Sequence, residues 1–375
     1  MKDILLLGAT GSIGSQVLDI IRKRPQDFRL VAFSFGYNVE KAKAIIEEFK
    51  PELVVSPFAE ALSQIKKSDI LVDSNLLKVV EYPADNPWVI NALVGSVGLS
   101  PSIRTLELNR PLLLANKESL VMGGALFTPF KEKGAIIVPI DSEHSALWQL
   151  LKTNQAKHLY ITASGGALRD MPLAKLKDAT ALDCLNHPTW QMGPKITIDS
   201  ATMMNKVFEI VEAYYLFGYS KDHISALIDR TSNVHALIEL ADGTVLAHMA
   251  PNDMHLPIEY AMDYPNGIDY NTNHLIYKDL KQAMRKLKLK TLDEKRYPLF
   301  SFAQTILTSE GFSGVIVNAV NEVLVEKFIM NEISFSTLIE RLLSALERYQ
   351  NHDLTYNLEN IIELNDKILK EESQC

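Results

Sequence analysis

Three glycines spaced by two residues follow a short apolar run at the start of the chain, and they constrain the fold more than any other feature. Gly8, Gly11 and Gly14 come directly after the apolar residues 4–7 and before a segment with helical spacing. Glycines let the backbone turn tightly and approach a pyrophosphate, while the following helix offers N–H groups and partial positive charge. This order predicts a dinucleotide-binding domain. The alternative is a glycine-rich turn that holds no ligand.

Short apolar runs alternate with amphipathic segments in the first part of the chain, and this alternation predicts a parallel sheet. Parallel strands need crossover helices, so such a chain folds into a sheet that is covered on both faces. We therefore expect an α/β fold with an N-terminal Rossmann-like parallel sheet. The expected strands are residues 4–7, 30–33, 53–55, 70–72, 89–93, 112–114 and 135–140, with helices between them at, for example, 39–49 and 57–65.

The remainder of the chain predicts a mixed region and then a helical one. Residues 234–240 and 244–249 are joined by an Asp-Gly turn, which is typical of an antiparallel hairpin. Helical spacing marks residues 299–307, 313–327, 334–350 and 357–371 and predicts a C-terminal helical bundle. We predict a Rossmann-like domain at 1–140, a central α+β catalytic domain at 141–265, a linker at 266–290 and a helical domain at 291–375.

Composition limits the partners that this chain could have. The 375 residues carry a formal net charge of −8, which argues against nucleic acid because phosphate backbones attract basic proteins. The chain has two cysteines, Cys184 and Cys375, so no disulfide framework is expected. Its first apolar run is too short for a signal peptide, and no stretch approaches the roughly 20 apolar residues of a membrane span. We expect a cytoplasmic protein that makes no membrane contact.

The end of the second expected strand bears on the choice between NAD and NADP. A carboxylate there would hold the ribose 2′-hydroxyl of NAD. The turn instead reads Ser-Phe-Gly-Tyr-Asn, and its first carboxylate, Glu40, is expected inside the next helix. This absence favours NADP. No basic residue stands in the turn either, since the nearest are Lys41 and Lys43, although Tyr37 and Asn38 could donate hydrogen bonds to a phosphate.

Acidic residues gather at two places that could form one metal site. Asp141 and Glu143 follow the strand expected at 135–140, and in an extended segment residues i and i+2 face the same way. Glu209 and Glu212 are three residues apart and share a face of an expected helix. Carboxylates without cysteine ligands suit a hard cation, Mg²⁺ or Mn²⁺. The alternative is a solvated strand end and an exposed helix face.

Two further segments carry groups that bind phosphate. Residues 200–206 are dense in hydroxyl, amide and ammonium groups, and Lys206 stands in the opening turn of an expected helix, where a cation needs a compensating anion. Ser164 precedes two glycines after a further strand, which suits close backbone approach to a ligand. A loop with His187 and Trp190 follows and could exclude water from a site. The alternatives are a surface lysine, a plain turn and ordinary packing of the tryptophan.

Six blocks of sequence, in this order and at this spacing, resemble the 1-deoxy-D-xylulose 5-phosphate reductoisomerase family. The resemblance spans the whole chain, including the helical C-terminal region. The blocks are Gly8-Ala9-Thr10-Gly11-Ser12-Ile13-Gly14, Leu114-Ala115-Asn116-Lys117-Glu118-Ser119-Leu120, Pro139-Ile140-Asp141-Ser142-Glu143-His144, Ala163-Ser164-Gly165-Gly166, His187-Pro188 with Trp190 and Met192-Gly193, and Asp199-Ser200-Ala201-Thr202-Met203-Met204-Asn205-Lys206.

This resemblance implies an enzyme of isoprenoid precursor synthesis, which rearranges 1-deoxy-D-xylulose 5-phosphate and reduces the product to 2-C-methyl-D-erythritol 4-phosphate. It also implies NADPH and a divalent cation, Mg²⁺ or Mn²⁺, as cofactors, a small phosphorylated sugar as substrate, and a homodimer. The family members often carry a basic residue where this chain has Tyr37. Asp229-Arg230-Thr231-Ser232 replaces a stretch that often resembles His-Pro-Gln-Ser, and we expect it to change packing or a subunit contact rather than the chemistry.

The resemblance also implies roles for individual residues. Glu209 is favoured over Glu212 as a metal ligand, with Lys117 and His187 joining the metal ligands as catalytic residues. The implied metal ligands are Asp141, Glu143 and Glu209. The implied substrate-binding residues are Lys117, Ser142, Glu143, Ser164, His187, Trp190, Ser200, Asn205, Lys206 and Glu209. The implied NADPH-binding residues are Thr10, Gly11, Ser12, Ile13, Gly36, Tyr37, Asn38, Asn116, Glu118 and Gly193.

Two other classes of function are compatible with parts of this pattern. One is a different NAD(P)-dependent oxidoreductase without a metal, such as a sugar or semialdehyde dehydrogenase, which a chelator would leave active. The other is a regulatory protein that senses NADPH and turns nothing over. The polar strand ends and the paired carboxylates argue against the second class.

Overall fold

The computed structural model describes residues 1–65, 70–267, 287–309, 311–349 and 354–375. The chain divides into two compact units by contact. The first comprises Met1–Ser119, Leu126–Asp141 and Met254–His274, and the second Leu120–Ala125, Ser142–Asp253 and Leu275–Cys375. The four-part division predicted from the sequence stays a prediction, and most of its linker, residues 266–290, lies outside the described residues.

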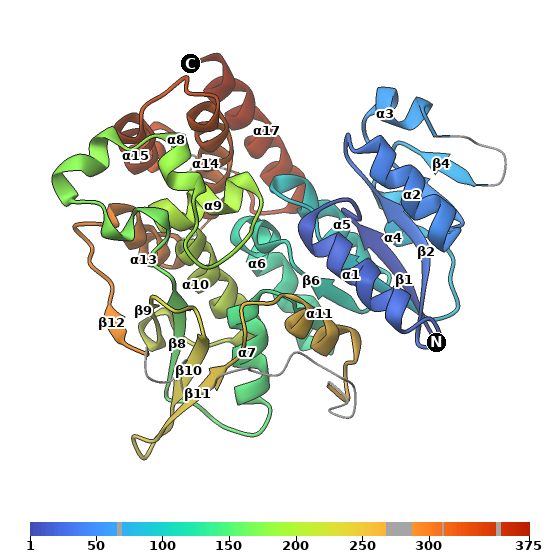
Figure 1. The fold of residues 1–375 in the computed structure, drawn as a ribbon, viewed down its shortest axis with the longest axis horizontal. Coiled ribbons are helices and arrows are strands. Elements are labelled where there is room, and N and C mark those ends of the chain that lie inside the picture. The colour runs from blue at the N-terminus through green and yellow to red at the C-terminus, as the bar shows by residue number, and fades with distance from the viewer. Residues whose placement is uncertain (66–69, 268–286, 310, 350–353) are drawn as a thin grey trace. The chain divides into compact units, whose positions relative to one another are not determined.

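The first unit contains a seven-stranded sheet whose pairs are all parallel, which confirms the predicted fold class (Figure 1). The strand order is β4-β3-β2-β1-β5-β6-β7, so the direction of winding reverses between β1 and β5. In such sheets, ligands bind outside the carboxyl ends of the strands at that reversal. The strands are β1 (Lys2–Leu7), β2 (Phe28–Ser34), β3 (Leu53–Val55), β4 (Leu71–Asp73), β5 (Pro87–Asn91), β6 (Leu112–Leu114) and β7 (Ile137–Pro139).

Helices cover both faces of this sheet because its strands are apolar on both sides. Ile4 and Leu6 of β1 share a buried cluster with residues of α1, α2 and α11, whereas Leu5 and Leu7 alternate to the opposite face, on which α4 and α5 pack. The helices of this unit are α1 (Ser12–Lys23), α2 (Val39–Phe49), α3 (Ala59–Ser63), α4 (Leu77–Glu81), α5 (Leu99–Glu107), α11 (His255–Met262) and the short 3₁₀ helix η1 (Ser96–Gly98). Both ends of α6 (Lys117–Glu132) also belong to it, whereas the middle of α6, Leu120–Ala125, belongs to the second unit.

The second unit is built on a five-stranded mixed sheet in the order β11-β10-β8-β9-β12. β8 and β9 pair in parallel, and the predicted hairpin is confirmed by the antiparallel pairing of β10 with β11. Helices α7 and α10 pack on this sheet. The strands are β8 (His158–Ala163), β9 (Ile224–Asp229), β10 (Val234–Glu239), β11 (Val245–Met249) and β12 (Leu289–Thr291).

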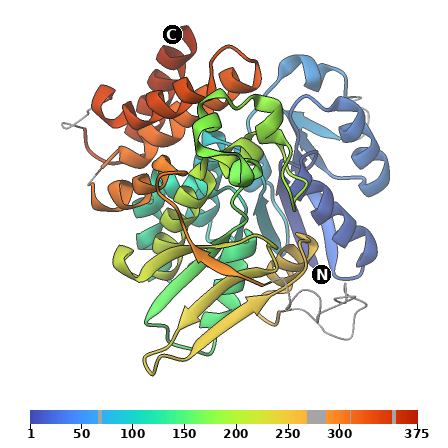
Figure 2. The ribbon, with the colours of Figure 1, turned by 60° about the vertical axis from the view of Figure 1, so that its left-hand side comes forward.

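The C-terminal helices of the second unit pack around α14. Their orange and red ribbons lie together in Figure 2. The helix predicted at 334–350 is two helices, which meet at Ser344. The helices of this unit are α7 (Ser142–Leu151), α8 (Ala181–Leu185), α9 (Pro194–Thr202), α10 (Met204–Phe217), α13 (Phe302–Thr308), α14 (Ser313–Ile329), α15 (Phe335–Leu343), α16 (Ala345–Arg348) and α17 (Leu358–Gln374), with 3₁₀ helices η2 (Ala167–Asp170), η3 (Leu173–Asp178), η4 (Lys221–His223) and η5 (Pro298–Ser301).

α14 fixes the position of α9, which carries one of the predicted phosphate-binding segments. The buried Asn321 of α14 donates a hydrogen bond of 2.8 Å to Asp199 Oδ1, and Lys195 Nζ lies 2.8 Å from Asp199 Oδ2. α14 also packs closely on the middle of α6, because a Cβ atom added at Gly314 would lie 2.0 Å from the carbonyl oxygen of Val121. Among the described residues, no helix is both long enough and apolar enough to cross a bilayer.

Replacing Gly314 by alanine should therefore destabilise the second unit, although alanine is the better helix former. The added methyl group must push α14 away from the backbone at Val121, and such overpacking costs about 1–3 kcal/mol. Urea-induced unfolding should show a lower midpoint for Gly314→Ala. Glu326→Ala, at an exposed position of the same helix, is the control and should stay within about 0.5 kcal/mol of the parent. An unchanged midpoint for Gly314→Ala would contradict this packing.

Candidate active site

The glycine turn after β1 has the backbone geometry that its sequence predicts. Gly8 has a φ of +81°, and a Cβ atom there would lie 2.6 Å from the carbonyl oxygen of Ala92. A Cβ atom at Gly14 would lie 2.3 Å from the carbonyl oxygen of Gly8. Gly11 is the N-cap of α1 and offers no side-chain cap to the first turn. This helix start therefore presents backbone N–H groups to a ligand, as a pyrophosphate site requires.

The turn after the carboxyl end of β2 presents an exposed aromatic side chain. Tyr37 is 72% exposed, and its ring stacks on Phe58 with the centroids 3.7 Å apart. Asn38 caps α2, because its Oδ1 accepts a hydrogen bond of 3.1 Å from the Lys41 backbone N–H. Gly36, Tyr37 and Asn38 thus form the turn between β2 and α2, on the same unit as the glycine turn.

The start of α6 is built around the buried amide of Asn116. Its Oδ1 accepts from the Ser119 backbone N–H at 3.1 Å, and its Nδ2 donates to the carbonyl oxygens of Leu93 and Gly95 at 3.1 and 3.0 Å. Asn116 therefore ties the loop after β5 to α6, and its predicted contact with a cofactor stays a prediction. The same holds for Glu118, whose Oε2 accepts from Asn116 at 3.0 Å.

Three carboxylates predicted as metal ligands lie close together. Asp141, Glu143 and Glu209 each offer an oxygen within 4.8 Å of the others. Asp141 is bonded directly to Ser142, the first residue of α7, and Glu143 follows in the first turn of that helix, while Glu209 is buried on α10. An all-oxygen, partly buried donor set of this kind suits a hard divalent cation. Glu143 and Glu209 are 66 positions apart in the sequence, and the fold brings their carboxylates together.

The predicted reason for the pairing of Asp141 with Glu143 was wrong. The segment is not extended, because α7 begins at Ser142 and Glu143 already has helical geometry. Asp141 lies just before the helix, where its carboxylate forms an ion pair of 2.6 Å with Lys117 Nζ. The two carboxylates are therefore brought together by a strand-to-helix turn and not by the alternation of a strand.

A buried lysine of the second unit forms ion pairs with two of the three carboxylates. Lys206 Nζ lies 2.8 Å from Glu143 Oε1, and it also forms an ion pair with Glu209 and donates to the carbonyl oxygen of Thr162. Burial alone would lower the pKa of Lys206, but the charges of Glu143 and Glu209 outweigh burial and raise the pKa of Lys206 above its ordinary value. A lysine in the first turn of a helix was expected to need a compensating anion. Glu143 and Glu209 supply that negative charge.

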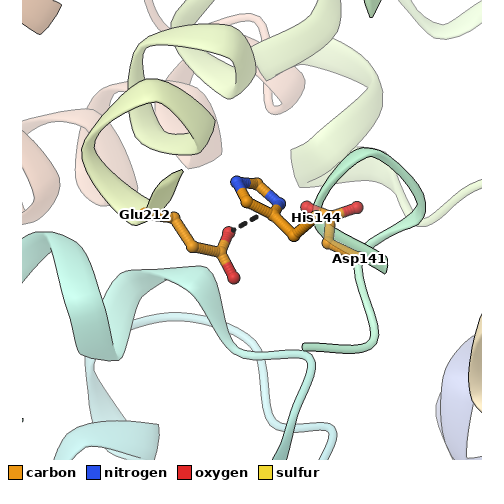
Figure 3. A group of neighbouring side chains, drawn as sticks. All are labelled: Asp141, His144 and Glu212. Carbon is orange, nitrogen blue, oxygen red and sulfur yellow. Dashed lines mark ion pairs between the residues drawn. The ribbon is translucent and has the colours of Figure 1, made fainter. Parts of the chain in front are cut away.

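Asp141 also belongs to a second group of side chains that could hold a metal ion. Figure 3 shows this group, which consists of Asp141, His144 and Glu212. The buried His144 of α7 lies with its Nδ1 3.5 Å from Glu212 Oε2, and its Nε2 lies 2.8 Å from the carbonyl oxygen of Glu209. Glu212 therefore packs against the histidine, while Glu209 joins Glu143 and Lys206. This arrangement is compatible with the implied preference for Glu209 over Glu212 as a metal ligand.

The Ser164 turn lies against the segment that carries Ser200. Gly166 has a φ of +67°, and a Cβ atom there would lie 2.5 Å from the carbonyl oxygen of Ser200. Only glycine permits this approach, so the two predicted phosphate-binding segments are neighbours. Asn205 and Lys206 follow in the first turn of α10, after the left-handed residue Met203.

His187 is held as a neutral imidazole in the loop between α8 and α9. Its Nδ1 accepts from the backbone N–H groups of Thr189 and Trp190 at 3.3 and 2.9 Å, so the ring proton must be on Nε2. Nε2 then donates to Ser164 Oγ at 2.9 Å, which also accepts from the Gly166 N–H at 3.0 Å. Since Ser164 Oγ accepts twice, its own hydroxyl proton is available for donation to an anion.

The loop with Trp190 contacts the turn that Asp229-Arg230-Thr231-Ser232 forms after β9. The Thr189 and Ser232 hydroxyls lie 2.9 Å apart, and the Trp190 ring contacts the edge of His235 with centroids 6.2 Å apart. Asp229 is fully buried and organises this turn. Its carboxylate accepts from the backbone N–H groups of Thr231, Asn233 and Val234 at 3.0 Å each.

Arg169 was not singled out in the sequence, yet it connects two of these segments. Its Nη1 donates to the carbonyl oxygen of Ser164 at 2.8 Å and to that of Arg230 at 2.9 Å. The residue stands five positions after Ser164, and no spacing rule would have assigned it to either segment.

Gly193, predicted to bind the cofactor, is the N-cap of α9 and is exposed in the second unit.

Family models of 1-deoxy-D-xylulose 5-phosphate reductoisomerase match most of the chain. The model of that enzyme matches residues 4–124, and the model of its C-terminal domain matches residues 137–217. A further model, described as the DXP reductoisomerase C-terminal domain, matches residues 249–371.

Curated proteins and solved structures with the same name are similar over nearly full length. The chain is 40% identical over 369 residues to 1-deoxy-D-xylulose 5-phosphate reductoisomerase of Macrococcus caseolyticus (strain JCSC5402), covering 96% of this chain and 97% of the relative. It is 40% identical over 361 residues to that of Geobacillus sp. (strain WCH70), covering 93% of each. A crystal structure of DOX-P reductoisomerase with NADPH, fosmidomycin and magnesium has a TM-score of 0.89 at 32% identity, covering 100% of this chain and 98% of the other. The Zymomonas mobilis enzyme with NADPH has a TM-score of 0.86 at 27% identity, with the same coverage.

The burial and hydrogen bonds of His187 predict the pH at which its imidazole titrates and the tautomer that it adopts. Burial, with a smaller contribution from Arg169, lowers the pKa of His187 from 6.5 to about 4. At a pH between about 4 and 6.5, His187 binds a proton in the unfolded chain but not in the folded one. The free energy that favours the folded loop is therefore at its full value above pH 6.5 and decreases as the pH falls towards 4. Histidine ¹⁵N NMR should show the Nε2–H tautomer at pH 7 and a midpoint well below 6. His187→Gln identifies the signal, and a midpoint near 6.5 would contradict this arrangement.

Proposed function

Because the chain belongs to the 1-deoxy-D-xylulose 5-phosphate reductoisomerase family, we infer that it converts 1-deoxy-D-xylulose 5-phosphate to 2-C-methyl-D-erythritol 4-phosphate. The enzyme rearranges the carbon skeleton and then reduces the product with NADPH, in the synthesis of isoprenoid precursors. The observation that carries this assignment is the gathering of three carboxylates with a buried lysine, on a chain that family models match along most of its length. Family membership decides against both a metal-free dehydrogenase and a sensor without turnover.

The cofactors are NADPH and a divalent cation. The glycine turn and the uncapped start of α1 suit the pyrophosphate of NADPH, which supplies the hydride. The donor set of Asp141, Glu143 and Glu209 suits Mg²⁺ or Mn²⁺, which when bound supplies Lewis-acid stabilisation of negative charge on the substrate oxygens. The proposed NADPH-binding residues are Thr10, Gly11, Ser12, Ile13, Gly36, Tyr37, Asn38, Asn116, Glu118 and Gly193.

The substrate phosphate is proposed to bind where the Ser164 turn meets α9 and α10. The approach of Gly166 to Ser200 supports this placement, and so does the Ser164 hydroxyl, whose proton is available for an anion. Lys206 supplies the positive charge, and a divalent cation on Glu143 and Glu209 would compete with its ammonium for those carboxylates. Binding energy from a phosphate far from the reacting carbons positions the substrate. The proposed phosphate ligands are Ser164, Ser200, Asn205 and Lys206.

The remaining residues are proposed to act on the sugar chain. Lys117 and Ser142 contact the hydroxyl or carbonyl end, and the ion pair of Lys117 with Asp141 keeps its ammonium beside the metal ligands. His187 contacts the substrate from the loop, and Trp190 covers the carbon skeleton. The contact of Thr189 with Ser232 supports a fixed resting position for that loop.

A homodimer is proposed from the resemblance to the family, and a cytoplasmic location from the composition of the chain. The two cysteines Cys184 and Cys375 are free thiols, which suits a reducing compartment.

Replacing Glu209 by glutamine should abolish most of the activity while leaving NADPH binding near normal. The change removes one negative ligand of the cation without changing the shape of the side chain, and the loss of one preorganised electrostatic group in an active site costs about 100- to 1,000-fold in kcat. NADPH binding measured by fluorescence titration should be retained, because the glycine turn is in the other unit. Glu326→Gln, at an exposed site of α14, is the matched control and should behave as the parent. A fully active Glu209→Gln enzyme would remove this residue from the metal site.

The overall assignment is tested by NADPH oxidation with 1-deoxy-D-xylulose 5-phosphate as substrate. Absorbance at the nicotinamide band should fall only when both substrate and Mg²⁺ or Mn²⁺ are present. EDTA should stop the reaction, and excess metal should restore it. Turnover that persists in EDTA would indicate a metal-free oxidoreductase, and NADPH binding without turnover would indicate a sensor.

A further inference from the structure

We propose that Lys41 recognises the 2′-phosphate of NADPH in this protein. This inference rests on the proposed use of NADPH. It concerns the region where the glycine turn, the carboxyl end of β2 and the first turn of α2 meet, all within the first unit.

The ammonium of Lys41 lies at the glycine turn. Nζ donates a hydrogen bond of 3.0 Å to the carbonyl oxygen of Thr10 and another to Ser15 Oγ in the first turn of α1. Ser15 Oγ in turn donates to the carbonyl oxygen of Gly11. The side chain thus reaches from α2 across to the turn that contacts the dinucleotide, and it is half-buried there.

This position is where a Rossmann-like fold holds the adenosine ribose. The ribose hydroxyls lie between the end of β2 and the glycine turn, and a cation nearby accommodates the 2′-phosphate of NADP. Lys41 contacts both the turn after β2 and the glycine turn. Its backbone N–H bonds to Asn38 Oδ1 at 3.1 Å, and its ammonium bonds to Thr10.

The charge of Lys41 is not cancelled by the groups that hold it. A carbonyl and a hydroxyl oxygen are neutral, so these partners orient the ammonium without neutralising it. Lys43, two residues on, is different. It is exposed and forms an ion pair of 2.8 Å with Glu40, whose side chain is 83% exposed. Lys43 is therefore the matched control for Lys41, with the same charge on the same helix.

Tyr37 cannot supply that charge. Its exposed ring is stacked on Phe58 and offers a flat aromatic surface and a hydroxyl, both of them neutral. A phosphate dianion at the ribose would then depend on a cation from elsewhere on this surface. A hydrogen bond to a charged group is worth about 10- to 100-fold in a binding constant.

The test is fluorescence titration of the full-length protein with NADPH and with NADH. Lys41→Ala and Lys41→Gln should weaken NADPH binding by about 10- to 100-fold and change NADH binding by less than about threefold. Lys41→Arg should keep the parental preference, and Lys43→Ala should change neither affinity. The NADH measurement is needed because Lys41 also braces the glycine turn. Equal weakening of both nucleotides would show a structural role and would overturn the proposal.

A charge rescue gives a second, independent measurement. Tyr37→Arg in the Lys41→Ala background should recover most of the lost preference for NADPH, because it returns a cation to the same surface. Failure of this rescue, together with an unchanged NADPH-to-NADH ratio in Lys41→Ala, would contradict the role of Lys41. Failure of the parental protein to bind NADPH would contradict the proposed function itself, so the two outcomes can be told apart.

Discussion

The structure depends on the compensation of negative charge where Asp141, Glu143 and Glu209 gather. Three carboxylates with oxygens within 4.8 Å repel one another, and such a group persists only with cations beside it. Lys206 holds Glu143 and Glu209, and Lys117 holds Asp141. The same residues that make this group tolerable in the folded chain are those proposed to bind the substrate. Charge balance and ligand binding therefore use one set of side chains.

Backbone freedom at a few glycines determines which segments become neighbours. Gly8 allows the turn after β1 to approach the backbone at Ala92, Gly14 allows α1 to lie close to that turn, and Gly166 allows the Ser164 turn to approach Ser200. A methyl group at any of these positions would meet backbone atoms at less than 3 Å. The nucleotide turn in the first unit and the phosphate turn in the second thus follow the same physical rule.

Local sequence predicted the elements better than it predicted the contacts between them. Strand β3 and helix α2 have the predicted bounds, because β3 is a short run of fully apolar, buried residues and Asn38 caps the helix. The carboxylate group was indicated by resemblance, but the extended geometry proposed for it was wrong because α7 starts at Ser142. The roles of Asp229 and Arg169 were beyond sequence reasoning. Their partners are backbone groups, which residue spacing does not identify.

The central claim is that one divalent cation binds to Asp141, Glu143 and Glu209. Anomalous diffraction from crystals grown with Mn²⁺ tests it most directly. A single peak should lie at about 2.0–2.2 Å from an oxygen of each carboxylate, with the Lys206 ammonium displaced from Glu143 and Glu209. A peak bound to His144 and Glu212 instead, or no peak near either group at millimolar Mn²⁺, would contradict the account.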